Sequence, residues 1–160
     1  MEIKRQPEPI EITGYDDHHA GAFERLNRAW LEEHNLLEEG DLKHLQHPRE
    51  SILNPGGEIF LAMRDGEVVG TCAVVPVEPG VFELVKLTVA DEVRGKGVGR
   101  RLTECAIEWA RERGASRVVL ISASPLKNAL RLYERLGFAY HPLPANVGYE
   151  TADIYMELAL

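Results

Sequence analysis

The chain has 160 residues, of which 44% are hydrophobic and 28% charged, and its formal net charge is −8. This length suits one domain with its own core, predicted over residues 1–160, and the composition is that of a folded globular protein. The acidic balance argues against nucleic acid as a partner. No apolar run reaches membrane-spanning length and residues 1–9 contain no apolar leader, so we expect a cytoplasmic protein with no membrane partner.

Hydrophobic periodicity and turn residues predict the elements in chain order. They are a loose tail at 1–9, a strand near 10–12, helices at about 17–35 and 41–46, strands at 58–63, 67–75 and 81–89, a helix at about 98–113, a strand at 118–121, a helix at about 125–136, and strands at 138–141 and 153–158.

Short local signals set several of these boundaries. Asp16 or Asp17 is expected to cap the first helix, and Ser124 with Pro125 is expected to begin the last one. The pair Asp65-Gly66 predicts a tight hairpin. Pro79-Gly80 predicts the next turn, so three antiparallel strands follow one another.

Three successive antiparallel strands oppose a doubly wound fold, in which helices would alternate with strands from the beginning. The continuous apolar strand at 118–121 is expected to be central and parallel to the strand that ends at Val89. The sequence therefore predicts an α+β fold with a mixed, mostly antiparallel central sheet flanked by helices.

Acid-rich patches lie between the first helix and the hairpins. They are Glu32-Glu33 and Glu38-Glu39 with Asp41. Such patches usually form solvated faces, and contact with a substrate is the alternative.

A glycine-rich loop, residues 94–99, links strand 81–89 to the following helix. Its three glycines at alternate positions allow several backbone N–H groups to point one way, and the helix start adds its positive dipole end. Arg94, Lys96, Arg100 and Arg101 add positive charge. The loop therefore predicts an anion cradle for a phosphate-bearing small ligand.

Two common nucleotide motifs do not fit this loop. A dinucleotide fingerprint needs glycine where Arg100 stands, and strand 118–121 carries no acidic residue for a ribose. A P-loop needs Lys-Ser/Thr after its last glycine, where Arg100-Arg101 follows Gly99. A plain strand-to-helix turn with solvated arginines is the structural alternative.

Two motifs resemble the GNAT superfamily of N-acetyltransferases. Arg94, Gly97 and Gly99 match R-x-x-G-x-G/A, and the segment 129–138 matches A-x-x-x-Y-x-x-x-G-F. The close resemblance covers about residues 81–138. It implies the GNAT fold, with a splayed parallel strand pair, and acetyl-CoA as cosubstrate.

The resemblance also implies which residues bind the coenzyme. They are Leu87, Thr88, Val89, Arg94, Gly95, Lys96, Gly97, Val98, Gly99 and Arg100. One departure is that Leu126 stands where many members have an asparagine, so a coenzyme contact of that type is not assumed.

Tyr133 matches the family position that protonates the departing thiolate, and a core tyrosine is the structural alternative. Glu83 lies six residues before Val89, an offset that the resemblance associates with a catalytic base. Strict alternation would put residues 81, 83, 85, 87 and 89 on one strand face and Lys86 on the other. Glu83 is therefore the candidate base, with a cross-strand ion pair as the alternative. The oxyanion donor is expected to be a backbone N–H near Val89.

Neither a metal site nor a disulfide framework is indicated. Cys72 and Cys105 fall on apolar positions and are expected to be buried thiols. The six histidines, which include His44 and His47 at helical spacing, lack partners to complete a site. We therefore expect solvated histidines and no metal.

The sequence predicts an acetyl-CoA-dependent N-acetyltransferase that transfers an acetyl group directly to a primary amine in a ternary complex. A non-catalytic acyl-CoA-binding sensor is the alternative, and it would have no use for Tyr133. The acceptor, a small-molecule or peptide amine, stays open among amino acids, polyamines, aminoglycosides and protein N-termini. The acidic patches favour a small cationic amine. A homodimer is also left open.

Overall fold

The computed structural model describes residues 9–145 and 147–160. The loose tail predicted over residues 1–9 lies outside these ranges except for Pro9.

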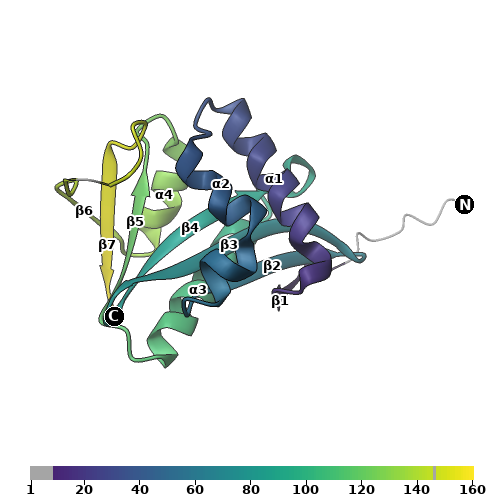
Figure 1. The fold of residues 1–160 in the computed structure, drawn as a ribbon, viewed down its shortest axis with the longest axis horizontal. Helices are drawn as coiled ribbons and strands as arrows, with labels where there is room; N and C mark the ends of the chain where they lie inside the picture. Colours follow the sequence, from purple (N-terminus) through teal and green to yellow (C-terminus); the bar gives the residue numbers. More distant parts are fainter. Residues whose placement is uncertain (1–8, 146) are drawn as a thin grey trace, which may run out of the picture.

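One seven-stranded sheet with four α-helices makes up the described part of the chain (Figure 1). The elements are β1 (Glu11–Gly14), α1 (Ala20–Glu33), α2 (Glu39–Gln46), β2 (Glu58–Arg64), β3 (Glu67–Glu78), β4 (Val81–Val89), α3 (Val98–Glu112), β5 (Arg117–Ser122), α4 (Lys127–Arg135), β6 (Ala139–His141) and β7 (Ile154–Ala159). Single turns of 3-10 helix precede α1 and α3, and a short π-helical turn precedes β2.

The strands are ordered β1-β2-β3-β4-β5-β7-β6. Only β4 and β5 pair in parallel, and every other neighbouring pair is antiparallel. The predicted α+β fold is confirmed. Both predicted hairpins are present, and Asp65 and Gly66 have the positive φ angles (53° and 78°) that a tight two-residue turn requires.

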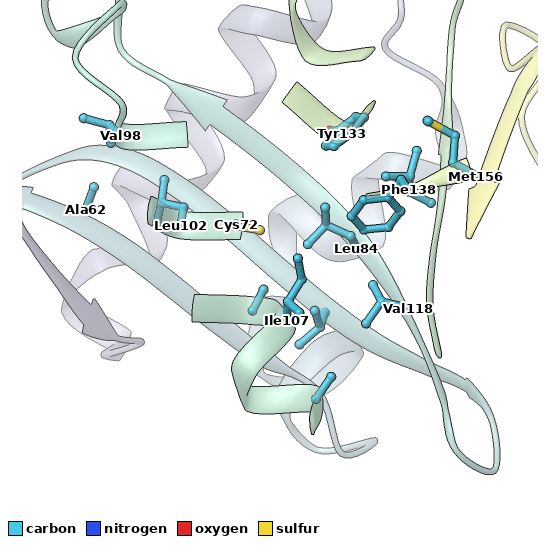
Figure 2. Packing of buried hydrophobic residues seen from close by; sticks show 14 of the residues in the cluster. Ala62, Cys72, Leu84, Val98, Leu102, Ile107, Val118, Tyr133, Phe138 and Met156 are labelled. Atoms are coloured by element: carbon cyan, nitrogen blue, oxygen red, sulfur yellow. The ribbon is translucent and has the colours of Figure 1, made fainter. Parts of the chain in front are cut away.

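The sheet buries both of its faces under helices (Figure 1). On one face α1 and α2 cover a core that includes Phe23 and Leu61. On the other face α3 and α4 cover a larger core, part of which Figure 2 shows, including Leu102, Leu84 and Met156. The two layers hold the central strands β3 and β4 from both sides.

Strands β4 and β5 separate midway along β4. Their pairing runs from Val81 opposite Arg117 to Leu84 opposite Leu120 and ends there, although β4 continues to Val89. The splayed parallel pair is therefore present. Backbone groups along the second half of β4 are left without a strand on that side.

A bulge interrupts β4 at the same level. Thr71 of β3 lies opposite Thr88, whereas Ala73 lies opposite Val85, so Cys72 faces two residues, Lys86 and Leu87. Lys86 takes a φ of +54°, which a non-glycine residue adopts at a cost of about 1–2 kcal/mol.

The bulge makes the predicted alternation along β4 wrong. Val85 contacts the core beneath α1 and α2, whereas Leu87 and Val89 contact the core beneath α3. Since the extra residue reverses the pleat, Lys86 lies on the same face as Glu83.

Two smaller expectations are also corrected. The last helix begins at Lys127, because Ser124 hydrogen-bonds through its backbone N–H and its hydroxyl to the Asp153 carboxylate (both 2.7 Å) instead of capping the helix. Cys72 is fully buried as expected, but Cys105 is partly exposed.

Candidate functional site

A groove of about 670 Å³ runs along the N-terminal end of α3 and the length of α4. Gly95 and Gly97 have φ angles of +76° and +77°, and a side chain at either position would meet no atom within 4 Å. Their backbone is thus open to a ligand. Gly97 is also the N-cap of α3, where unpaired N–H groups favour an anion.

All the residues predicted to bind the coenzyme line this groove except Lys96. Lys96 is exposed on the loop and lies outside the groove lining. Two of the lining arginines have acidic partners: Arg94 pairs with Asp91 at 2.9 Å, and Arg100 pairs with Glu104 at 2.7 Å. These exposed pairs leave the groove positive but reduce its charge.

The opposite wall of the groove was not predicted from the sequence. Lys127, Arg131 and Arg135 of α4 line it and make no ion pair with another described residue. They lie four residues apart, so they form one stripe on the helix. That spacing is visible in the sequence and is the signal that could have identified this wall.

A second, smaller cavity of about 160 Å³ lies where β4 and β5 separate. The two cavities share five lining residues, namely Trp30, Leu87, Thr88, Leu126 and Ala129. A ligand in the groove could therefore extend into the small cavity along the second half of β4. Both candidate catalytic residues, Glu83 and Tyr133, line this small cavity.

Tyr133 lies on α4 with 8% of its surface exposed, against the ring of Phe138 at a centroid distance of 5.8 Å (Figure 2). Its hydroxyl makes no hydrogen bond with another described residue. Burial raises the pKa of Tyr133, so the hydroxyl keeps its proton at neutral pH. The residue is part of the core and also lines the cavity with a protonated hydroxyl.

Glu83 enters the small cavity from β4, on the face covered by α1 and α2. It makes no hydrogen bond or ion pair within the described chain. Burial raises its pKa, and the positive charges of Lys86 and Lys43 lower it in part. A raised pKa suits a carboxylate that accepts a proton near neutral pH.

The side chain of Lys86 forms a buried ion pair with Asp41 at the start of α2. The two side chains are 8% and 5% exposed. The second oxygen of Asp41 accepts a hydrogen bond from the backbone N–H of Glu38 at 2.9 Å. The prediction that this acidic patch forms a solvated face is therefore wrong for Asp41, which holds the bulge of β4 to α2.

A buried hydrogen-bond network supports the same bulge from α1. The Asn27 amide donates to the Thr71 hydroxyl at 3.0 Å and accepts from the Thr88 hydroxyl at 2.7 Å. The Thr71 hydroxyl in turn donates to the backbone carbonyl of Lys86 at 2.7 Å. Asn27 and Thr88 also line the small cavity, so the polar network fixes part of its wall.

The loop between β6 and β7 closes one side of the small cavity. Glu38 accepts hydrogen bonds from the backbone N–H groups of Glu150 and Thr151 (2.8 and 3.1 Å) and from the Thr151 hydroxyl. Tyr149 packs beside Gly40 and lines the cavity. Burial, with the negative charges of Asp41, Glu83 and Glu38, raises the pKa of Tyr149.

In the described ranges, no group of three or more His, Cys, Asp or Glu side chains is arranged to hold a metal ion. His44 is not solvated as predicted, because it is buried and contacts the Ser51 hydroxyl at 3.2 Å. Burial and the nearby lysines lower its pKa to about 4. None of the described helices combines the length and the apolar character needed to cross a membrane.

Solved structures with the same fold include a GNAT-family acetyltransferase from Staphylococcus aureus Mu50, with a TM-score of 0.87, 20% identity, and coverage of 95% of this chain and 99% of that one. Another is the PaiA N-acetyltransferase of Thermoplasma acidophilum in complex with coenzyme A, with a TM-score of 0.75, 17% identity, and coverage of 95% and 99%. At these identities the likeness concerns the fold.

Sequence relatives include the uncharacterized N-acetyltransferase YjgM of Escherichia coli (strain K12), which is 38% identical over 89 residues, 54% of this chain and 53% of that protein. The chain spans about half the length of the curated relatives it matches. The model of the Acetyltransferase (GNAT) family matches residues 20–138, which include α1, the whole of β4, the glycine loop and Tyr133. The chain therefore belongs to the acetyltransferase (GNAT) family.

Proposed function

We propose that this protein is an acetyl-CoA-dependent N-acetyltransferase that transfers the acetyl group to a primary amine by direct attack in a ternary complex. Family membership supplies the reaction class. The observation that carries the proposal is the junction of the two cavities, because it would bring a thioester in the groove beside Glu83 and Tyr133.

The groove suits the phosphates of coenzyme A. The N–H groups at the start of α3 would face the pyrophosphate, with Arg94 and Arg100 on one wall and the basic stripe of α4 on the other. The PaiA enzyme of similar fold was solved with coenzyme A, which supports the same ligand here.

The small cavity suits the chemistry of transfer. Glu83 would accept a proton from the ammonium group of the acceptor, and the free amine would then attack the thioester carbonyl. A new C–N bond forms, the C–S bond breaks, and Tyr133 would donate its hydroxyl proton to the departing thiolate. The proton that the nitrogen loses as the amide forms would restore the Tyr133 hydroxyl. A sensor of acyl-CoA would need the groove but not this carboxyl and hydroxyl.

The oxyanion of the tetrahedral intermediate needs an N–H donor. Ala90 donates its N–H to Val69 of β3 at 2.8 Å. Successive N–H groups of a strand point to opposite edges, so the N–H of Val89 faces the side from which β5 has departed. That group is our candidate donor.

A screen of amines with acetyl-CoA tests this proposal. The panel would contain amino acids, polyamines, aminoglycosides, simple amines and peptides, with thiol release as the readout and the acetylated amine identified by mass spectrometry. We expect amine-dependent thiol release above the rate of hydrolysis without amine. Tight binding of acetyl-CoA with no turnover of any amine would instead favour the sensor.

A further inference from the structure

The small cavity limits which acceptor can reach the reaction centre, and this inference rests on the function proposed above. Its volume of about 160 Å³ is close to that of an engineered cavity of about 150 Å³ that holds one benzene molecule. Because the acetyl end of the thioester would also reach this cavity, the part of the acceptor that it encloses is no larger than about one aromatic ring.

The body of such an acceptor would meet mainly apolar side chains. Trp30, Leu31 and Leu36 of α1 and its following loop line one side, and Val85 of β4 lines another. The ring of Tyr149 adds an aromatic surface from the loop between β6 and β7. These walls favour an apolar or aromatic body over a strongly polar one.

The charged side chains that line the cavity are Asp41, Glu83 and Lys86. Lys86 is the one cation among the described lining residues, and its charge is already neutralised by Asp41 in the buried ion pair. Lys43 acts on Glu83 from α2 but does not line the cavity, and the Glu38 carboxylate is occupied by the loop. Glu83 is thus left as the charged group without a partner.

We propose that the acceptor is a compact primary amine with an apolar or aromatic body and no carboxylate beside its amino group. The ammonium would lie at Glu83 and the body against Trp30 and Leu36. A carboxylate beside the amino group would lie close to Glu83, and the described lining residues offer it no unpaired cation. Burying an unpaired anion in this way is strongly unfavourable.

Three amines of similar shape distinguish the effect of a negative charge on turnover from the effect of size. They are phenethylamine, L-phenylalanine and L-phenylalaninamide. The amide has nearly the shape of the amino acid but carries no negative charge. We expect acetylation of phenethylamine and of the amide, and a kcat/KM for L-phenylalanine at least about 100-fold below that of the amide.

Asp41→Asn tests the role of the ion pair, because it should free the charge of Lys86 while the asparagine carbonyl can still accept from the Glu38 N–H. The ratio of kcat/KM for L-phenylalanine to that for the amide should rise about tenfold or more. Asp17→Asn is the matched control, since it breaks an exposed pair with Arg49 and should leave the ratio unchanged.

Equal kcat/KM values for L-phenylalanine and L-phenylalaninamide would overturn the inference. This comparison uses the unmodified protein, so it tests the inference even if Asp41→Asn does not fold. Turnover confined to polyamines, aminoglycosides or peptides would also overturn it, while the proposed function would stand. Absence of turnover with every amine in the wider screen would instead reject the proposed function, and this inference with it.

Discussion

Tyr133 has a buried ring but a hydroxyl without a hydrogen-bond partner in the described chain, so its two roles can be separated. Tyr133→Phe keeps the ring and its contact with Phe138, and we expect a change of at most about 0.5 kcal/mol in the free energy of unfolding. Turnover should fall about 10²- to 10⁴-fold, because the proposed proton donor for the thiolate is lost. Thermal unfolding and single-turnover kinetics measure the two effects.

Tyr140→Phe is the matched control, since Tyr140 is half exposed and its hydroxyl donates to Glu134 outside both cavities. It should leave turnover unchanged. A large loss of stability in Tyr133→Phe with normal turnover would make Tyr133 a core residue only.

The buried carboxyl of Glu83 predicts how the stability of the protein depends on pH. Burial raises its pKa above the ordinary value of 4.5, so the folded protein holds this proton more tightly than the unfolded chain. Stability from this group is therefore present below pH 4.5 and is lost as the pH rises through the raised pKa. Glu83→Gln should raise the melting temperature at pH 7 but not at pH 4.

The same variant should lower kcat/KM about 10²- to 10⁴-fold and remove the acidic limb of its pH profile. Coenzyme affinity should hardly change, because Glu83 lies outside the groove lining. A near-normal rate with an unchanged pH profile would contradict the assignment of Glu83 as base.

Some residues of the candidate site could be identified from the sequence, and others could not. Tyr133 and the glycines of the loop belong to local motifs, so the resemblance to the GNAT superfamily was enough to single them out. Asp41 and Asn27 did not, because their partners Lys86 and Thr88 lie 45 and 61 residues away in the chain. An acidic residue in a charged stretch is solvated unless such a distant partner exists.

At the scale of elements, β4 carries most of what the sequence could not predict. Alternation of apolar residues implied a regular strand, but the bulge at Lys86 reverses the faces of residues 86–89 relative to 81–85. A lysine at positive φ gives no sequence signal. It is held there by tertiary contacts from Asp41 of α2 and Thr71 of β3.

The two ends of α3 offer a matched test of the groove. Gly97 and Gly114 have φ angles of +77° and +74°, and a side chain at either would meet no atom within 4 Å. Aspartate at either position therefore carries similar backbone strain. Only Gly97→Asp puts a negative charge in the groove, where like charges about 4 Å apart repel by about 4 kcal/mol at an effective dielectric constant of 20.

We expect Gly97→Asp to weaken coenzyme A binding at least about 100-fold and Gly114→Asp to leave it unchanged. Calorimetric titration measures both affinities, and the melting temperature without ligand reports the shared strain. Equal affinities in two folded variants would place the coenzyme outside this groove.

At the scale of the whole molecule, a chain of three charged side chains connects the loop between β6 and β7 to the centre of the sheet. Glu38 binds the loop, Asp41 binds the backbone of Glu38, and Lys86 binds Asp41 at the bulge of β4. The overall architecture followed from element order, but this connection did not. It depends on an irregular loop that carries no periodic pattern, and Glu150 lies 112 residues from Glu38.

Glu38→Gln tests whether that connection shapes the acceptor site. Burial alone would raise the pKa of Glu38, but the hydrogen bonds from Thr151 and Glu150 outweigh it and lower the pKa below 4.5. The carboxylate therefore stabilises the loop above that pH, and the contribution is lost as the pH falls through the lowered pKa. Glutamine replaces one acceptor oxygen with a donor, so one backbone N–H of the loop loses its partner.

Amide exchange at Glu150 and Thr151 should accelerate up to about tenfold in Glu38→Gln, and KM for the amine should rise, because the loop lines the small cavity through Tyr149 and Thr151. Affinity for coenzyme A should not change, since none of the described residues of this loop lines the groove. Glu39→Gln is the control, because the exposed Glu39 makes no hydrogen bond or ion pair in the described chain. Faster exchange with an unaltered KM would separate loop order from acceptor binding, and equal effects in both variants would show that Glu38 does not hold the loop in solution.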